Sequence, residues 1–173
     1  MHFPPLDFDR APLASRATLK QARLAYGRVP NLLASLAESP TALDSYVQLT
    51  ANLARGTLQA AQRERIALTI SEFSGCEYCL AAHSWLGRRA QLSVQEIQQC
   101  ISQPGAHPLT RLASRLVETQ GALNSSDLSE AVAAGFDKAQ ILEVVACVAW
   151  MHFSNYLGNL MKPDIDFPAA DML

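Results

Sequence analysis

The sequence predicts an all-α protein built as a single domain. Apolar residues recur at helical spacing along nearly the whole chain, and no segment shows the alternation of a convincing strand. The chain has 173 residues, which is enough for one domain with a sizeable core. The predicted helices follow one another without an interdomain linker, and no repeat at a solenoid period is present.

The composition is that of an ordinary, slightly apolar globular protein. Apolar residues make up 49% of the chain and charged residues 17%, with a formal net charge of −2. Because no stretch is strongly basic, a nucleic-acid partner is not expected. The N-terminus lacks the features of a secretory signal, and the most apolar segment, 141–153, is too short to span a bilayer and contains Glu143. We therefore expect a cytoplasmic protein without a membrane segment.

The N-terminal half is predicted to contain an extended arm followed by helices. The arm is expected from its prolines, and one helix start is marked by a serine followed by proline, which suit the cap and the first helical position. In order, the expected segments are an arm over 1–14, a helix over 15–27, a short segment over 31–38, a helix beginning at Ser39 and Pro40, and a helix over 59–73.

In the C-terminal half, helix starts are predicted from capping boxes, in which a capping side chain is followed three residues later by Glu or Gln. The last helix, 138–161, is apolar nearly all round and is therefore expected to be central and buried. The predicted boxes are Ser74 with Glu77, Ser93 with Glu96 and Asp137 with Gln140; an apolar stripe over 109–117 indicates a further helix, and Pro163 begins an extended tail, 163–173.

The stretch "SGCEYCLAAHSWLG", residues 74–87, carries the candidate chemistry. On a helix, Cys76, Cys79 and His83 share one half-buried face. Cys76 falls in the first turn, where free backbone amides and the helix dipole favour a thiolate. His83 lies one turn after Cys79 and can accept a thiol proton. This pattern outlines a dithiol redox centre, in which one sulfur is oxidised and the other closes a disulfide.

Zinc binding and simple core packing are the alternatives for these residues. A structural zinc site needs four ligands, whereas the Cys-x-x-Cys pair and His83 supply three. Cys100 and Cys147 are isolated in the sequence and are expected to pack in the core. We therefore expect no metal, and the dithiol chemistry requires no organic cofactor.

A histidine that moves protons needs a group to hold it, and three acids are near in the sequence. Glu77 is assigned to the predicted cap. Glu64 lies near the start of the preceding helix and could return to His83 if the two helices pack antiparallel or at a sharp angle. Glu72 precedes the turn between them. The residues alone do not decide between Glu64 and Glu72.

The segment "QRERIALTISEFSGCEYCLAAHSWLG" resembles the core motif of the alkylhydroperoxidase-D (AhpD) and carboxymuconolactone decarboxylase family. That motif is a glutamate followed about a dozen residues later by Cys-x-x-Cys-x-x-x-His, with Tyr or His between the cysteines. The matching residues here are Glu64, Cys76, Tyr78, Cys79 and His83. "VPNLLASLAESPTALDSYVQL" and "FSNYLGNLMKPDIDFP" are similar, more weakly, to the subgroup called uncharacterised peroxidase-related proteins.

The resemblance implies an AhpD-like helical bundle that assembles as a homo-oligomer, a trimer or hexamer. It also implies an alkyl hydroperoxide or peroxide reductase that takes electrons from an external dithiol or a lipoyl-bearing protein. In that reaction Cys79 attacks the hydroperoxide, Cys76 resolves the oxidised sulfur, and Glu64 and His83 relay the proton. The decarboxylase reaction is disfavoured, because that branch of the family generally lacks the cysteine pair.

At three positions the family motif adds to, or differs from, what the residues alone indicate. The resemblance selects Glu64 over Glu72. It makes Cys79 the attacking sulfur, whereas the helix start favours Cys76 as the more acidic thiol. Tyr78 stands where some members have histidine, and its hydroxyl can support the site by donating a hydrogen bond.

Polar residues in the last helix have two interpretations. His152, Ser154 and Asn155 form either a buried network or subunit contact, or a pocket wall near the thiols, for which His152 and Asn155 are the candidates. Trp85 and Trp150 are expected to pack in the core or at an interface. The alternative function is a redox-sensing or interaction module of the same fold with little turnover.

Overall fold

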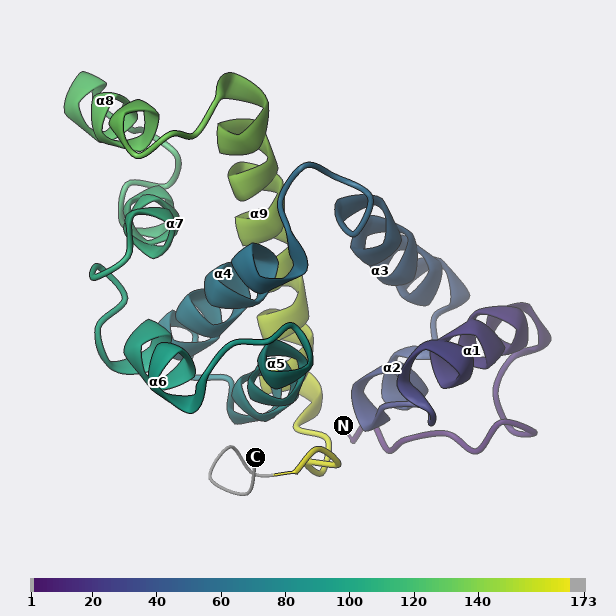
Figure 1. The fold of residues 1–173 in the computed structure, drawn as a ribbon. Helices are drawn as coiled ribbons and strands as arrows, with labels where there is room; N and C mark the ends of the chain where they lie inside the picture. Colours follow the sequence, from purple (N-terminus) through teal and green to yellow (C-terminus); the bar gives the residue numbers. More distant parts are fainter. Residues whose placement is uncertain (1, 169–173) are drawn as a thin grey trace.

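The computed structural model describes residues 2–168, and over this range the chain forms nine helices and no strand (Figure 1). The all-α fold class is therefore confirmed. The helices are α1 (Leu13–Tyr26), α2 (Asn31–Leu36), α3 (Pro40–Leu53), α4 (Ala60–Phe73), α5 (Glu77–Arg89), α6 (Val94–Ser102), α7 (Pro108–Glu118), α8 (Ser125–Ala133) and α9 (Lys138–Met161).

Both ends of the described chain lie outside the helices, and a turn at residues 8–10 interrupts the arm that was expected to be extended. The arm is shorter than expected because α1 already begins at Leu13, and residues 163–168 follow α9 without forming a helix. The remaining residues of the predicted arm and tail, 1 and 169–173, lie outside the described part of the chain.

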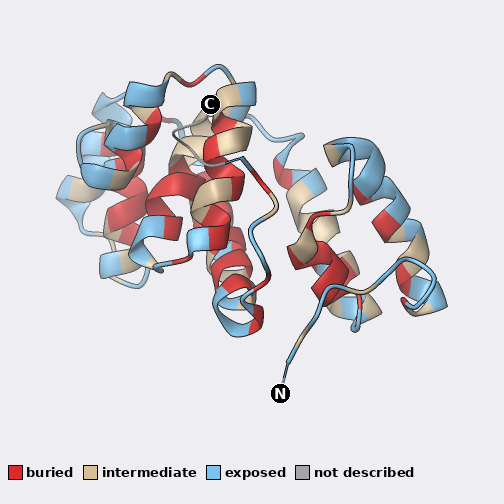
Figure 2. Ribbon diagram, turned by 90° about the horizontal axis from the view of Figure 1, so that it is seen from below, coloured by how far each residue is buried: buried red, intermediate tan, exposed pale blue. Residues whose placement is uncertain are grey.

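The two central helices are α4 and α9. Figure 1 shows α9 running through the middle of the molecule, with α1–α3 on one side and α4–α8 on the other. α4 packs against α5, α6, α7 and α9, and its residues 66–71 are all buried. Buried residues accordingly gather where α4, α5 and α9 meet (Figure 2). The site described below lies on α5, between this core and the helices α2 and α3.

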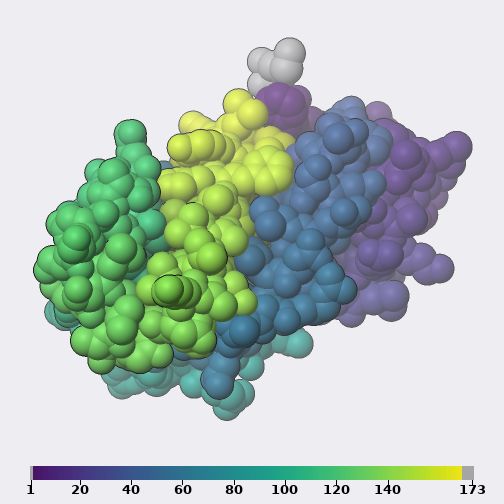
Figure 3. All heavy atoms as spheres, turned by 90° about the horizontal axis from the view of Figure 1, so that it is seen from above, coloured from purple at the N-terminus to yellow at the C-terminus, as the bar shows by residue number. Residues whose placement is uncertain are grey.

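The predicted central position of α9 is confirmed for one of its faces. α9 packs against α3, α4 and α7, while Leu142, Tyr156 and Leu160 on its other face are exposed. Figure 3 shows this face as a strip between α3 and the α7–α8 region. The helix is longer than the apolar run 141–153. Within the described residues it is the one helix long and apolar enough to cross a membrane. Its packing against α3, α4 and α7 also accounts for this apolar composition.

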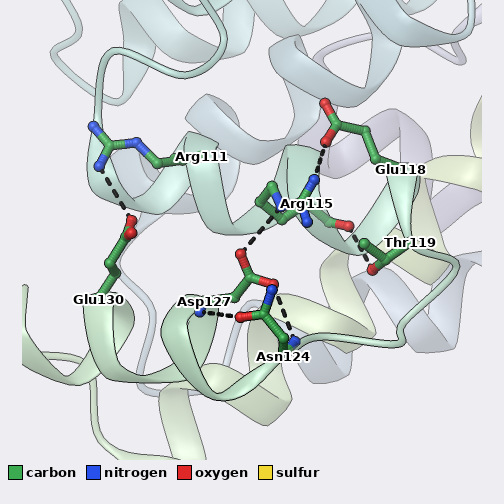
Figure 4. Close-up of polar contacts among 7 residues, drawn as sticks. All are labelled: Arg111, Arg115, Glu118, Thr119, Asn124, Asp127 and Glu130. Carbon is green, nitrogen blue, oxygen red and sulfur yellow. Dashed lines mark hydrogen bonds and ion pairs between the residues drawn. The ribbon is translucent and has the colours of Figure 1, made fainter.

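α8 is the helix that the sequence interpretation lacks. Its start is a reciprocal cap between Asn124 and Asp127, in which each side chain accepts a hydrogen bond from the backbone N–H of the other (Figure 4). Arg115 on α7 also bonds Asp127, at 3.1 Å, and Arg111 lies 3.5 Å from Glu130. The sequence therefore contains a capping box for α8, but this box uses Asn and Asp, whereas the predicted boxes use Ser with Glu or Asp with Gln.

Candidate active site

The turn between α4 and α5 corrects the prediction of a Ser74–Glu77 capping box. Ser74 still belongs to the end of α4, because its N–H donates to the Ile70 carbonyl at 3.1 Å. Gly75 then turns the chain with a φ of +58°, a conformation that favours glycine. The cap of α5 is Cys76, whose Sγ accepts a hydrogen bond from the Cys79 N–H at 3.4 Å. A sulfur atom therefore occupies the positive end of the helix.

Hydrogen bonding gives the two thiols of the pair opposite acidities. The Cys79 thiol donates to the Cys76 sulfur, and with the backbone amides of Cys79 and Tyr78 this lowers the pKa of Cys76 to about 7. The same contact holds the proton on Cys79 and, together with burial, raises the pKa of that thiol. Negative charge on the pair therefore resides on Cys76, as the helix start predicted.

Glu64 and His83 form the buried acid–histidine pair. Glu64 Oε2 lies 2.7 Å from His83 Nδ1, and His83 is only 4% exposed. The pair forms because α4 packs against α5, as the sequence expectation required. Glu72 is exposed at the end of α4, so the structure places Glu64 beside the histidine. With Nδ1 engaged by Glu64, Nε2 is the ring nitrogen left for proton transfer.

Cys79, His83 and Glu64 line one cavity of about 160 Å³. Its walls are largely aromatic and aliphatic and come from helices α1 to α5 and α9, and from Phe167 in the segment after α9. The remaining lining residues are Tyr26, Pro30, Leu32, Leu33, Tyr46, Thr50, Leu53, Ala54, Arg63, Tyr78, Ala82, Leu86, Trp150, Ser154 and Phe167. Such a cavity can hold a small, mostly apolar ligand next to the Cys79 sulfur.

Two hydroxyl groups form a chain of contacts that begins at Cys79. Ser154 Oγ lies 3.7 Å from Cys79 Sγ and 3.2 Å from the Tyr46 hydroxyl. The position of Ser154 follows the pocket-wall interpretation of the polar residues in the last helix, whereas the sequence does not assign Tyr46 to the site. No spacing rule would have found Tyr46, because α3 and α9 meet here through tertiary packing.

Tyr78 supports the site differently from the prediction. Its hydroxyl donates to Asp166 Oδ1 at 2.8 Å and accepts from the Leu32 N–H at 3.2 Å. The side chain thus joins α5 to α2 and to the segment after α9, and Phe167 packs edge-on against its ring at 5.7 Å. The hydroxyl has its partners in this junction, away from the two sulfurs.

The structure places neither His152 nor Asn155 in the wall of the Cys79 cavity. Asn155 is fully buried and bonds the Ile70 carbonyl and the Ser71 and Ser74 hydroxyls, so it joins α9 to α4. His152 is half-buried, with its ring beside that of Tyr156. Asn155 therefore follows the buried-network interpretation.

Gly158 is a site residue that the sequence interpretation missed. A Cβ atom at this position would lie 2.6 Å from Cys76 Sγ and 3.4 Å from Cys79 Sγ. Both sulfurs therefore pack against the same glycine of α9. The first of these distances is shorter than any ordinary contact, so a side chain at 158 would displace the Cys76 sulfur.

The two other cysteines lie outside the site, whereas the two tryptophans pack around it. Cys100 and Cys147 are buried free thiols, and burial raises both pKa values, that of Cys147 to about 12. Trp150 is buried, with its ring 5.6 Å from His83, and Trp85 packs on Phe167. Within residues 2–168 no group of three or more His, Cys, Asp or Glu side chains is arranged to hold a metal ion.

The helical arrangement is that of solved AhpD-like proteins. An AhpD-core, uncharacterised peroxidase-related protein from Ralstonia eutropha JMP134 shares 19% identity, with a TM-score of 0.83 over 96% of this chain and 92% of that one. An uncharacterised peroxidase-related protein from Silicibacter sp. TM1040 shares 21% identity, with a TM-score of 0.77 over 94% of this chain and 91% of that one. The debrominase Bmp8, solved with 2,3,4-tribromopyrrole, shares 17% with a TM-score of 0.76 over 99% and 94%.

The central segment of the chain matches a family model. Residues 40–117, from the start of α3 to the end of α7, match the model of the carboxymuconolactone decarboxylase family. This segment contains Glu64, Cys76, Cys79 and His83. The resemblance drawn from the motif is thereby confirmed. A comparison with curated protein sequences gave no match.

Proposed function

We propose that this protein is a dithiol peroxidase that reduces small organic hydroperoxides. The observation that carries the proposal is the opening of Cys79 into the same cavity as the Glu64–His83 pair. A thiol, a base and a binding space are thus combined at one point. The largely apolar walls favour an alkyl or aryl hydroperoxide over hydrogen peroxide.

The first step breaks the peroxide bond. The resting pair keeps its proton on Cys79, so the attacking thiolate forms only when His83, held by Glu64, accepts that proton on Nε2. The Cys79 thiolate then attacks the terminal oxygen of R–O–O–H. An S–O bond forms as the O–O bond breaks, and His83 returns the proton to the departing alkoxide. The products are an alcohol and a sulfenic acid on Cys79.

The second step closes the disulfide. The Cys76 thiolate, which its pKa of about 7 makes available at neutral pH, attacks the Cys79 sulfur. An S–S bond forms and the S–O bond breaks. The hydroxide leaves as water by taking a proton from solvent, which replaces the proton that Cys76 released when it ionised. An external dithiol or lipoyl-type reductant then supplies two electrons, so this cycle requires no metal or organic cofactor. Four free thiols in the described residues fit a reducing, cytoplasmic location.

The test is consumption of cumene hydroperoxide with dithiothreitol as donor. Wild-type protein should turn over, whereas Cys79→Ser should lose activity, because serine is a far weaker nucleophile. Cys147→Ser is the matched control, a buried cysteine outside the cavity, and should remain active. Full activity in Cys79→Ser would refute the assignment.

Reductive dehalogenation of an aromatic compound is a second candidate, favoured by the aromatic walls around Cys79. Tyr26, Tyr46 and Trp150 line the cavity, and the structurally similar Bmp8 is named a debrominase. Incubation with a brominated pyrrole or phenol and a dithiol distinguishes the two functions. Bromide release without hydroperoxide turnover would favour the dehalogenase.

A redox-sensing module is the alternative from another class. Tyr78, between the cysteines, is bonded to α2 and to the segment after α9, so oxidation of the pair has a route to the surface. A sensor would oxidise at the pair, turn over poorly and change its assembly. Measuring turnover together with oligomer size after one equivalent of peroxide separates sensor from enzyme.

We further propose that the protein is a homo-oligomer, a trimer or hexamer as the family resemblance implies. The exposed face of α9 supports association, because no Asp, Glu, Lys or Arg occurs from 144 to 161. The exposed apolar side chains there are Leu142, Val145, Tyr156 and Leu160. Mass measurement in solution, with Leu160→Glu as a disrupting variant, tests this; a wild-type monomer would refute it.

A further inference from the structure

The two sulfurs of the pair open toward different sides of the protein. Cys79 lines the cavity that contains His83, whereas Cys76 lines a separate groove of about 470 Å³. This groove is formed by the start of α5, the end of α9 and residues 162–165. Tyr78 lines both spaces and stands between them.

We propose that this groove is the entrance for the reductant, through which a slender dithiol reaches the Cys76 sulfur of the disulfide. The proposal rests on the proposed function in taking the Cys76–Cys79 disulfide as the oxidised state. It separates the two half-reactions in space: the oxidant meets Cys79 in the apolar cavity, and the reductant meets Cys76 in the groove.

The shape of the groove defines the class of reductant. Cys76 is only 1% exposed, so a sulfur on a flat protein surface cannot reach it. The Cys76 sulfur packs directly against the backbone of Gly158, so this end of the groove is narrow and admits only a slender chain. An unbranched dithiol, either free or at the end of a flexible arm, meets these requirements.

The electronic properties of the pair favour attack from this side. A donor thiolate attacks the Cys76 sulfur, the Cys76–Cys79 bond breaks, and Cys79 leaves with a proton from His83. The second donor thiolate then attacks the donor sulfur of the mixed disulfide. Cys76 leaves as the thiolate that its hydrogen bonds stabilise, and the donor ends as a disulfide.

The experiment follows the reduction half-reaction alone. The protein is oxidised with diamide, mixed with dithiothreitol, and quenched in acid; free thiols are counted by alkylation and mass. Ile165 lines the groove and is half exposed, so Ile165→Trp fills the mouth with little risk to folding. We expect this variant to slow reduction by at least about tenfold, because access to the attacked sulfur limits exchange.

Two further variants make the result specific. Ala54→Trp narrows the Cys79 cavity from its exposed rim and should slow oxidation by cumene hydroperoxide rather than reduction. Leu24→Trp, on the exposed face of α1, should change neither rate. If Ile165→Trp proves unstable, Ile165→Ala tests the opposite direction, since a wider mouth should speed reduction by a branched dithiol.

The proposal is overturned if diamide-oxidised Ile165→Trp is reduced at the wild-type rate. It is also overturned if Ala54→Trp slows reduction instead, because the reductant would then use the Cys79 cavity. Diamide replaces the peroxide in this experiment, so failure of the peroxidase assignment shows only in the cumene hydroperoxide assay. The two proposals therefore fail independently.

Discussion

Cys76 and Cys147 are both 1% exposed, yet their surroundings give their thiols opposite properties. Cys147 lies in the middle of α9, where burial raises its pKa to about 12. Cys76 caps α5 and accepts hydrogen bonds from a thiol and from backbone amides, which lower its pKa to about 7. Burial alone therefore does not distinguish a reactive cysteine from a packing residue; the hydrogen-bond donors aimed at the sulfur do.

The sharpest test of this comparison is the ionisation of the thiols. Because the pKa of Cys76 is lowered, its thiolate should appear as the pH rises through about 7, whereas Cys147 should stay protonated below pH 10. At pH 7 a substantial fraction of Cys76 should therefore be thiolate, whereas Cys147 should be almost entirely protonated. Alkylation with a small reagent from pH 5 to 10, read by peptide mass, measures both. Equal reactivity of the two thiols would contradict the comparison.

His83→Ala removes the base from the α5 region and leaves the environment of Cys147 unchanged. We expect hydroperoxide turnover to fall by about 10² to 10⁴, the usual contribution of a positioned acid–base group. Glu64→Gln should produce a smaller loss, because the amide can still orient the ring. Steady-state kinetics of both variants checks the order. A His83→Ala enzyme with wild-type turnover would exclude the relay.

Gly158→Ala tests whether the pair depends on the glycine behind it. The new Cβ would overlap Cys76 Sγ, and overpacking of this kind costs about 1–3 kcal/mol. Gly105 is the matched control, since a Cβ there meets no atom within 4 Å. Urea unfolding of the reduced proteins measures the difference. Equal stability of the two alanine variants would show that the sulfur can move aside freely.

Cys147→Ala is expected to have the smallest effect. Loss of a buried sulfur should cost about 1 kcal/mol of unfolding free energy, while turnover should stay within about twofold of the wild type. Thermal unfolding and the hydroperoxide assay measure the two quantities. A large loss of turnover would assign Cys147 a role that its position in α9 does not suggest.

Local rules predicted most of the fold, because the helices carry their own signals. The starts of α3, α6 and α9 follow from capping patterns, and the start of α4 lies close to prediction. α8 was missed because its cap uses Asn and Asp. The Ser74–Glu77 box was wrong because Ser74 completes α4, which left the cap to a cysteine side chain.

The candidate site was predictable only in part. Cys76, Cys79 and His83 lie within two turns of one helix, so spacing places them together. Glu64 required either the packing of α4 on α5 or the family resemblance. Tyr46, Ser154, Gly158 and Asp166 reach the site from α3, α9 and the segment after α9, and contacts of this kind depend on how distant segments pack.

The contact between Gly158 and the sulfurs also allows related sequences to be distinguished by the residue at this position. A Cβ at position 158 would overlap the Cys76 sulfur in its present position. Related chains that keep both cysteines but carry a larger residue here should therefore hold their dithiol in another geometry. A single position 79 residues beyond Cys79 thus becomes a marker that separates chains with this thiol arrangement from those that share only the motif.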